Sequence, residues 1–159
     1  MGALASVRTA VASPVTLARR VRCTPLRLPT DPTVPTAETL ERFIARVESN
    51  AHDVAIEEFY TEHSTMRENQ APPRVGRAAH VANERRVLPR ARAIRSACVR
   101  PVFVSGDFVV IRWRFRFDWL DGTVTELEEL AYQRWEGERL AEEQFFYDPA
   151  QRVPVRAPV

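Results

Sequence analysis

The clearest pattern in this sequence is the alternation of apolar and charged residues over positions 107–119, DFVVIRWRFRFDW. Every second position from Val109 to Trp119 is apolar, and the positions between them are charged after Val110. Consecutive side chains of a strand point to opposite faces of its sheet. The pattern therefore predicts a strand with one covered face and one polar face.

Similar strand-like segments fill the second half of the chain. Residues 91–147 read as long extended segments separated by SGD, LDG and EGE. The last two separators carry glycine in a position typical of hairpin turns. We therefore expect three or four long strands joined by short turns, forming an antiparallel sheet.

The first half of the chain has helical periodicity. The apolar residues Leu40, Phe43, Ile44 and Val47 recur at the spacing of one helix face. Thr36 precedes them and is a candidate N-cap. A first amphipathic helix is therefore predicted after Thr36, ending near the serine and asparagine at 49 and 50.

Two further helices and a short strand are expected before residue 91. A second helix follows Asn50, a candidate N-cap, because its apolar residues fall on one side. Residues 62–69 predict a short strand, and residues 75–88 predict a third helix that ends at Pro89. The small apolar face of this helix predicts close packing; it consists of Val75, Ala78, Ala79 and Ala82.

The order of these elements predicts an α+β fold, with helices packed on one face of an antiparallel sheet. The chain of 159 residues fits one domain. Residues 1–35 are proline-rich and lack acidic residues before Asp31, so they form an extension outside the core; an organelle-targeting segment is the alternative. We assign residues 36–150 to the domain and residues 151–159 to a tail.

Composition argues against several classes of function. All basic residues are arginine, and after residue 38 they are interleaved with acidic residues, which does not suit phosphate tracking along nucleic acid. No apolar run approaches the roughly 20 residues that span a membrane. The histidines at 52, 63 and 80 lack metal-ligand spacing, so no metal or cofactor is expected. Two cysteines without a secretory context suit reduced thiols in a cytoplasmic protein.

The order of elements resembles the cone-shaped fold shared by nuclear transport factor 2, ketosteroid isomerase and the SnoaL-like polyketide cyclases. The resemblance covers residues 36–150. It is carried by IEEFYTEHSTMREN, PPRVGRAAHVANE and the closing GERLAEEQFFYDP. It implies a strongly curved sheet that wraps a pocket closed by the helices. It also implies a homodimer through the outer face of the sheet, at Leu130, Tyr132 and Phe146.

The resemblance also implies where a catalytic base would lie. In the isomerases the short strand after the second helix carries this carboxylate, and the match places Glu68 there. Strand alternation then puts Ser64 and Met66 on the same face as Glu68 and His63 on the other. On the last two strands the pocket face is expected to comprise Glu129, Ala131, Gln133, Trp135, Glu143, Phe145 and Tyr147.

Roles follow from this placement. Glu68 is the candidate general base, Glu143 the complementary acid and Tyr147 a donor to a carbonyl or phenolate. Burial and nearby carboxylates raise the pKa of a glutamate toward neutrality, which suits acid and base catalysis. The remaining expected ligand contacts are Met66, Trp113, Phe115, Glu129, Gln133, Trp135 and Phe145.

One departure from the isomerases matters for the reaction. Their oxyanion is held by a tyrosine of the first helix and by a protonated acid of the penultimate strand. Here the first helix has no tyrosine, and the acid's position falls on Ala131. Donors to the developing charge are needed, so steroid isomerisation by that machinery is disfavoured.

Three functions remain open from sequence. The first is an acid/base isomerase, cyclase or dehydratase that acts on a small apolar ring compound without a metal. The second is a pocket that binds a small molecule without turnover, and the third is a dimeric interaction module with a filled cavity. A shift of one residue in register would exchange the two faces of a strand and leave the glutamates in solvent or in ion pairs. The aromatic stripe of Trp113, Phe115 and Phe117 could likewise be core rather than ligand wall.

Overall fold

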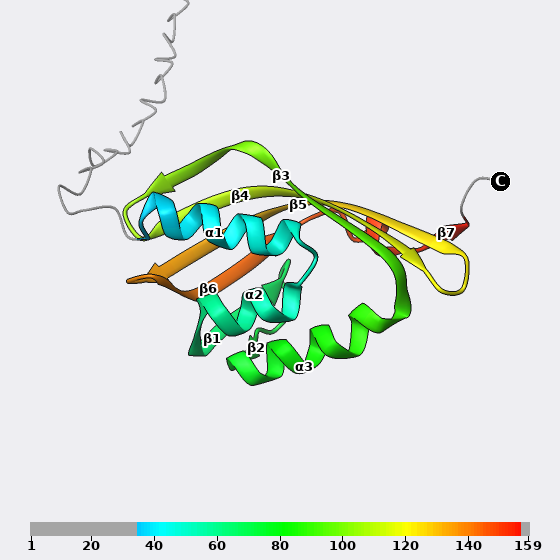
Figure 1. Cartoon of the computed structure of the whole chain (residues 1–159), viewed down its shortest axis with the longest axis horizontal. Helices are drawn as coiled ribbons and strands as arrows, with labels where there is room; N and C mark the ends of the chain where they lie inside the picture. Colours follow the sequence, from blue (N-terminus) through cyan, green and yellow to red (C-terminus); the bar gives the residue numbers. More distant parts are fainter. Residues whose placement is uncertain (1–34, 157–159) are drawn as a thin grey trace, which may run out of the picture.

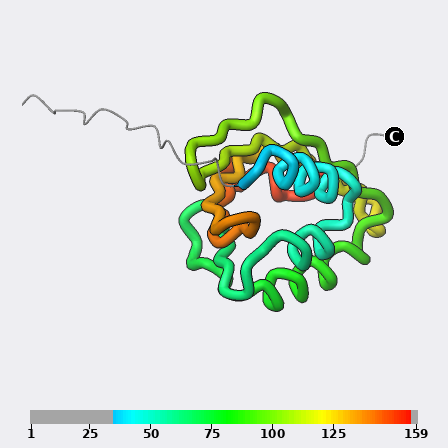
Figure 2. The backbone as a smooth tube through the Cα atoms, turned by 60° about the vertical axis from the view of Figure 1, so that its left-hand side comes forward, coloured from blue at the N-terminus to red at the C-terminus, as the bar shows by residue number. Residues whose placement is uncertain are grey.

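The computed structural model describes residues 35–156 and shows an α+β fold (Figure 1). Helices α1, α2 and α3 lie on the concave side of one curved seven-stranded sheet, and the two layers surround a common interior (Figure 2). The predicted fold class is therefore confirmed. The expected extension lies almost wholly outside the described residues.

Helix α1, Ala37–Glu48, forms as its sequence predicts. The Thr36 hydroxyl accepts a hydrogen bond from the Thr39 amide at 3.2 Å, which satisfies one of the free donors of the first turn. Phe43 and Ile44 are buried. Ring centroids of Phe43 lie 5.6 Å from Trp135 and 6.4 Å from Trp113, so α1 fills one end of the interior.

Helix α2, His52–Phe59, lacks the predicted cap. Its N-cap residue is Ala51, without a side-chain cap, and Asn50 has a φ of 64°. A positive φ suits asparagine better than most residues, so Asn50 forms the turn between the helices. Its side-chain oxygen instead accepts a hydrogen bond from Ser96 at 2.9 Å.

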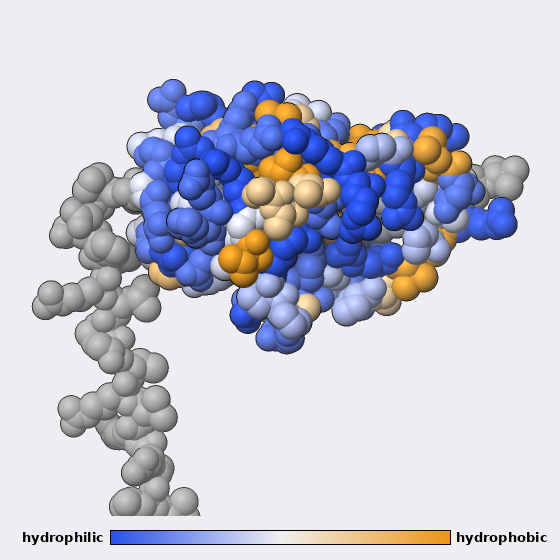
Figure 3. All heavy atoms as spheres, turned by 90° about the horizontal axis from the view of Figure 1, so that it is seen from below, coloured by the Kyte–Doolittle hydropathy of each residue, from blue (hydrophilic) through white to orange (hydrophobic). Residues whose placement is uncertain are grey.

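Helix α3, Arg77–Val87, does not pack through its alanines. His80 and Val81 are its buried residues, whereas Val75, Ala78, Ala79 and Ala82 are exposed. His80 accepts a hydrogen bond from Arg74 Nε at 3.1 Å, and its other ring nitrogen lies 3.0 Å from the Ser64 carbonyl. Buried polar contacts thus decide which side of α3 faces inward. Figure 3 shows the α3 side as mainly hydrophilic with small hydrophobic patches.

The sheet has the order β2-β1-β6-β5-β4-β3, with β7 beside β5. Its strands are β1 Tyr60–Glu68, β2 Arg74–Val75, β3 Ala91–Ser105, β4 Phe108–Trp119, β5 Thr123–Glu136, β6 Arg139–Phe146 and β7 Val155–Arg156. The short 3-10 helices η1 and η2 span Leu88–Arg90 and Pro149–Arg152. The long strands pair antiparallel as predicted, but β1 and β6 pair in parallel, so the sheet is mixed.

Strand β4 has the predicted covered and polar faces. Val109, Ile111 and Trp113 are buried on the concave side. On the convex side, Arg112 and Arg114 both donate to Glu128 of β5, at 2.8 Å and 2.7 Å. Such pairs of opposite charge between neighbouring strands stabilise the sheet.

Residues 151–156, which the sequence places in a tail, contact the sheet. The Gln151 side-chain oxygen accepts a hydrogen bond from the Glu128 amide at 2.7 Å, and β7 pairs with the start of β5. We propose that the folded domain extends to Arg156 rather than ending at residue 150. Over residues 35–156, the helices are all too short or too polar to cross a membrane.

Candidate functional site

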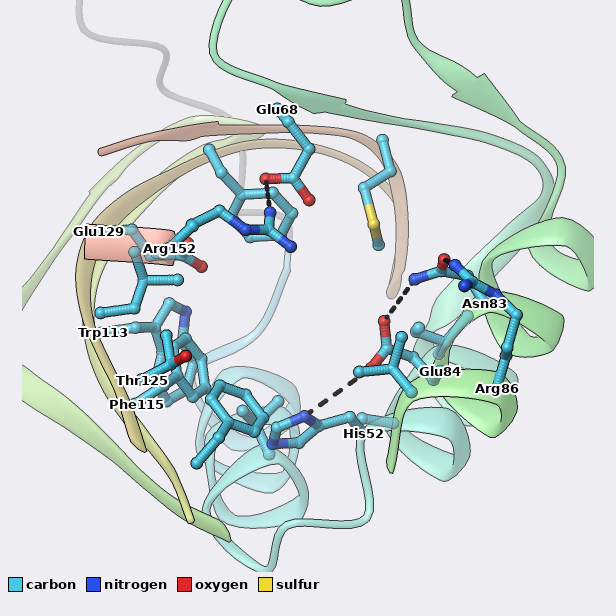
Figure 4. Close-up of a pocket in the computed structure, with 18 of the residues that line it drawn as sticks. His52, Glu68, Asn83, Glu84, Arg86, Trp113, Phe115, Thr125, Glu129 and Arg152 are labelled. Carbon is cyan, nitrogen blue, oxygen red and sulfur yellow. Dashed lines mark hydrogen bonds and ion pairs between the residues drawn. The ribbon is translucent and has the colours of Figure 1, made fainter. Parts of the chain in front are cut away.

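A cavity of about 540 Å³ lies between the concave face of the sheet and the helices (Figure 4). Its aromatic wall comes from β4, where Trp113, Phe115, Phe117 and Trp119 share one face. Successive rings stack with centroids 5.8, 6.2 and 5.2 Å apart. Flat, apolar walls of this kind bury ring-containing ligands.

Most of the residues predicted for the site line this cavity, and three do not. Glu68, Glu129 and Glu143 bring carboxyl groups to it from three different strands. The other predicted residues in its wall are Met66, Trp113, Phe115 and Phe145. Gln133 and Trp135 point inward as expected but are fully buried behind the wall, and Tyr147 follows the end of β6 outside the wall.

Glu143 is held by donors on both of its oxygens. Tyr60 donates a hydrogen bond to Oε2, and Gln133 Nε2 donates to Oε1 at 2.7 Å. Trp135 Nε1 in turn donates to Gln133 Oε1 at 3.1 Å, which fixes the amide orientation. Burial raises the pKa of Glu143 to about 7, although the two hydrogen bonds pull it down. The carboxyl group therefore titrates near neutral pH while it stays fixed in place.

Glu129 is buried in the middle of β5, with only 7% of its surface exposed. Burial raises its pKa well above the ordinary value, and the charges of Glu68 and Glu143 raise it further. Arg152 acts in the opposite direction but does not outweigh burial. The protonated form of Glu129, which can donate a hydrogen bond into the cavity, is thereby favoured.

Glu68, at the end of β1, is paired with a residue from η2. Arg152 Nη1 lies 3.0 Å from Glu68 Oε2 and also 3.0 Å from the Tyr147 hydroxyl. The guanidinium group lies over the Tyr147 ring at 5.5 Å. Figure 4 shows Arg152 between Glu68 and Glu129. Tyr147 thus reaches the site through Arg152.

The opposite side of the cavity carries polar residues that no sequence pattern singles out as part of a site. His52, the first residue of α2, lies with its Nδ1 4.0 Å from Oε2 of Glu84 on α3. Asn83 Nδ2 donates to the other Glu84 oxygen at 3.3 Å. Burial lowers the pKa of His52 to about 4 and raises that of Glu84. In the sequence, His52 and Glu84 differ from core residues only in lying outside the apolar stripe of their helices. Many surface residues share this property, so the sequence does not identify them.

Metal chemistry has no evident ligand set here. Within residues 35–156, His, Cys, Asp and Glu side chains do not gather in a group of three that could hold an ion. The cavity instead offers hydrogen-bond donors, carboxyl groups at different protonation levels and aromatic surface.

Solved structures of other proteins share this fold, whereas sequence comparison finds no relative. No protein-family profile and no curated protein matches the sequence. Solved structures do match at low identity. A nuclear transport factor 2-like protein of unknown function from Burkholderia pseudomallei has a TM-score of 0.62 at 15% identity, covering 73% of this chain and 92% of that one. The chain has the nuclear transport factor 2-like fold.

Two other structures with this fold are similar to the same degree. A putative SnoaL-like polyketide cyclase from Jannaschia sp. has a TM-score of 0.61 at 14% identity and covers 81% of this chain and 99% of its own. A ketosteroid isomerase-like protein from Catenulispora acidiphila, solved in complex with trimethylamine, has a TM-score of 0.61 at 15% identity and covers 73% and 89%. At these identities the likeness concerns the fold alone.

Proposed function

We propose that this protein binds a small ring compound bearing a carbonyl group and moves a proton at the carbon next to that carbonyl. Glu68 takes the proton as general base, and Glu129 donates to the carbonyl oxygen as it gains negative charge. Return of the proton from Glu68 to another carbon of a conjugated enolate gives isomerisation. Where the carbon beyond the enolate carries a hydroxyl group, that group takes the proton from Glu68 and leaves as water, which gives dehydration. Isomerisation and dehydration are two of the three reactions, with cyclisation, that the sequence left open for an acid/base enzyme.

The observation that carries this proposal is the contrast between two carboxyl groups on the same side of the cavity. Glu129 is buried and favours its neutral, proton-donating form, whereas Glu68 forms an ion pair with Arg152. Two nearby acids in different surroundings, one buried and one paired with an arginine, can divide the roles of acid and base. A neutral donor aimed at a developing oxyanion is worth several kcal/mol, roughly two to four.

Glu129 can also replace the protonated acid that the isomerases carry on the penultimate strand and that this chain lacks. The isomerase acid corresponds to Ala131, and Glu129 lies two residues earlier on the same face of β5. It supplies a protonated acid from the same strand at a different position. Glu143, the acid expected from sequence, already has a hydrogen bond on each oxygen, which favours Glu129 over it as donor to a ligand.

The aromatic wall supports a ring-shaped ligand, and some proteins of similar fold are described as polyketide cyclases or isomerase-like. The alternative is a pocket that binds such a compound without turnover. The same residues would hold a ligand in both cases, so the two differ in whether protons move.

Hydrogen exchange in heavy water tests the proposal directly. The protons next to the carbonyl of 1-tetralone, a flat bicyclic ketone, are followed by NMR with and without the protein. We expect catalysed exchange that falls about 100-fold in both Glu68→Gln and Glu129→Leu. Glu142→Gln, an exposed neighbour on the outer face, serves as the control and should exchange like the unaltered protein.

Native mass spectrometry and tryptophan fluorescence measure ligand binding, and comparison with the exchange rate separates an enzyme from a pocket without turnover. Trp113 and Trp119 line the cavity, so a bound ketone should quench their emission. Binding without catalysed exchange would favour the non-catalytic pocket. Exchange that persists unchanged in Glu68→Gln would remove Glu68 as the base.

A further inference from the structure

The polar residues on the far side of the cavity form a second hydrogen-bonding group with a defined polarity. Ser96 Oγ donates to Asn50 Oδ1 at 2.9 Å, and His52 Nε2 lies 2.8 Å from the same Ser96 oxygen. A hydroxyl group has one proton, and Asn50 receives it. Ser96 must therefore accept from His52, so Nε2 carries the imidazole proton. Nδ1 is left with its lone pair toward the cavity.

The ring of His52 is fixed in this orientation by its neighbours. It lies edge-on to Phe115 at 5.6 Å and to Phe117 at 6.5 Å between centroids. Burial lowers its pKa to about 4 and outweighs the charge of Asp53 and the Val47 backbone, which both raise it, so the imidazole is neutral at physiological pH. Nδ1 is thus a rigid, neutral acceptor.

Glu84 provides the matching donor. Its Oε1 accepts from Asn83, so a proton on the carboxyl group is placed on Oε2, the oxygen nearer His52. Burial raises the pKa of Glu84, which favours this protonated form, although the hydrogen bond from Asn83 and the charge of Arg74 both oppose it. Arg74 itself donates to His80 and Met66 rather than to Glu84.

The gap between Nδ1 and Oε2 is 4.0 Å. It exceeds the usual length of a hydrogen bond, about 3 Å, so the two groups do not bond directly. A single oxygen placed about 2.8 Å from each would span this gap. That oxygen must donate to Nδ1 and accept from Glu84, which is the hydrogen-bonding capacity of a hydroxyl group.

We propose that His52 Nδ1 and Glu84 Oε2 form a second subsite, which binds a hydroxyl group of the ligand. Figure 4 shows this pair on the side of the cavity opposite Glu68, Glu129 and Arg152, with aromatic side chains between the two groups. The ligand class is therefore a flat ring compound with a carbonyl at one end and a hydroxyl at the other. The carbonyl end rests on the proposed function, whereas the hydroxyl end rests on the His52 and Glu84 geometry alone.

A matched series of ketones tests the subsite. 1-Tetralone lacks the distal hydroxyl, 6-hydroxy-1-tetralone carries it, and 6-methoxy-1-tetralone keeps the oxygen but cannot donate. Dissociation constants are measured by quenching of tryptophan fluorescence. We expect the hydroxy compound to bind about tenfold more tightly than the other two, equivalent to about 1.4 kcal/mol.

Substitutions then locate the effect. His52→Phe keeps a flat ring beside Phe115 and Phe117 but removes Nδ1, and Glu84→Leu removes the opposite donor. Each should reduce the preference for the hydroxy compound to less than about twofold. Glu84→Gln keeps a donor at that position and should retain most of the preference. His63→Phe, at an exposed position of β1, is the matched control and should leave the preference unchanged.

The outcomes also distinguish the two proposals. Preference for the hydroxy compound without exchange next to the carbonyl would support the subsite and contradict the proposed reaction. Equal affinities of the three ketones, or no binding of the hydroxy compound at millimolar concentration, would overturn the subsite. A preference that survives both His52→Phe and Glu84→Leu, with folding verified by circular dichroism, would overturn it as well.

Discussion

Arg152 and Glu68 form an ion pair at 3.0 Å although 84 positions separate them in sequence. The contact depends on η2, which turns the chain back toward β1 after the last long strand. A residue assigned from sequence to a tail thus supplies a positive charge next to two acidic side chains of the cavity.

The first prediction concerns this positive charge. Arg152→Met should lower exchange next to the ketone carbonyl by about tenfold or more, because Glu68 loses the partner that positions its carboxylate. Arg152→Lys keeps the charge and should restore part of the rate. Arg156→Met, at an exposed position of β7, is the control. Equal rates in Arg152→Met and the unaltered protein would show that the ion pair has no role in proton transfer.

The second prediction separates two roles for Tyr147. Its hydroxyl accepts a hydrogen bond from Arg152 and lies outside the cavity wall, so we expect it to position Arg152. Tyr147→Phe should then lower exchange by less than about threefold, whereas loss of a direct donor to the carbonyl would cost about 100-fold. A loss of that size, with ligand affinity unchanged, would support the direct role expected from sequence.

Strand alternation explains why much of the site could be predicted. A one-residue shift between strands would move buried side chains to the solvent face, so a covered face fixes the pairing register. The inward positions of β4, β5 and β6 therefore follow from sequence once the covered face of β4 is known. Strand alternation does not show, however, whether an inward side chain lines the cavity or is buried behind its wall. Gln133 and Trp135 point inward but lie where α1 fills the interior with Phe43, and this depends on packing between distant segments.

The remaining site residues were missed because their placement depends on tertiary contacts. His52 and Glu84 lie on helices whose polar positions look alike in sequence, and the inward side of α3 is chosen by His80 rather than by alanines. The parallel pairing of β1 with β6 is also non-local. Alternation in a strand does not reveal the direction of its neighbour.

The third prediction concerns stability and pH. Burial gives Glu143 a pKa of about 7 in the folded protein, against an ordinary value of 4.5. The folded state therefore holds a proton that the unfolded state has lost between these values, so stability falls as pH rises from about 4.5 through 7. The difference corresponds to roughly 3 kcal/mol in the free energy of unfolding.

Glu143→Gln should remove this contribution. Urea unfolding at pH 5 and pH 8 should show a smaller loss of stability in the variant than in the unaltered protein, because glutamine does not titrate. His52, whose pKa is lowered, acts in the opposite sense, but it is present in both proteins and cancels in the comparison. Glu142→Gln, at the exposed position next to Glu143, is the control. Equal pH dependence of stability in Glu143→Gln and the unaltered protein would contradict a pKa of about 7 for Glu143.

The outer face of the sheet carries an apolar patch of Leu130, Tyr132, Phe146 and Phe108. Leu130 is paired in register with Phe146, and the Tyr132 ring lies 5.5 Å from the Phe108 ring. Leu130, Tyr132 and Phe146 are 46%, 44% and 40% exposed. Contiguous exposed apolar side chains on a sheet face are typical of interaction surfaces. We propose that a second copy of the chain covers this patch, as the resemblance implies for Leu130, Tyr132 and Phe146.

The fourth prediction follows from that surface. A charge placed at its centre by Leu130→Arg should convert a dimer into a monomer, because a buried arginine without a partner is costly to desolvate. Sedimentation equilibrium at micromolar concentration measures the mass. Leu120→Arg, in the turn between β4 and β5 and 69% exposed, is the matched control and should stay dimeric. An unaltered protein that sediments as a monomer at these concentrations would show that the patch does not pair two copies.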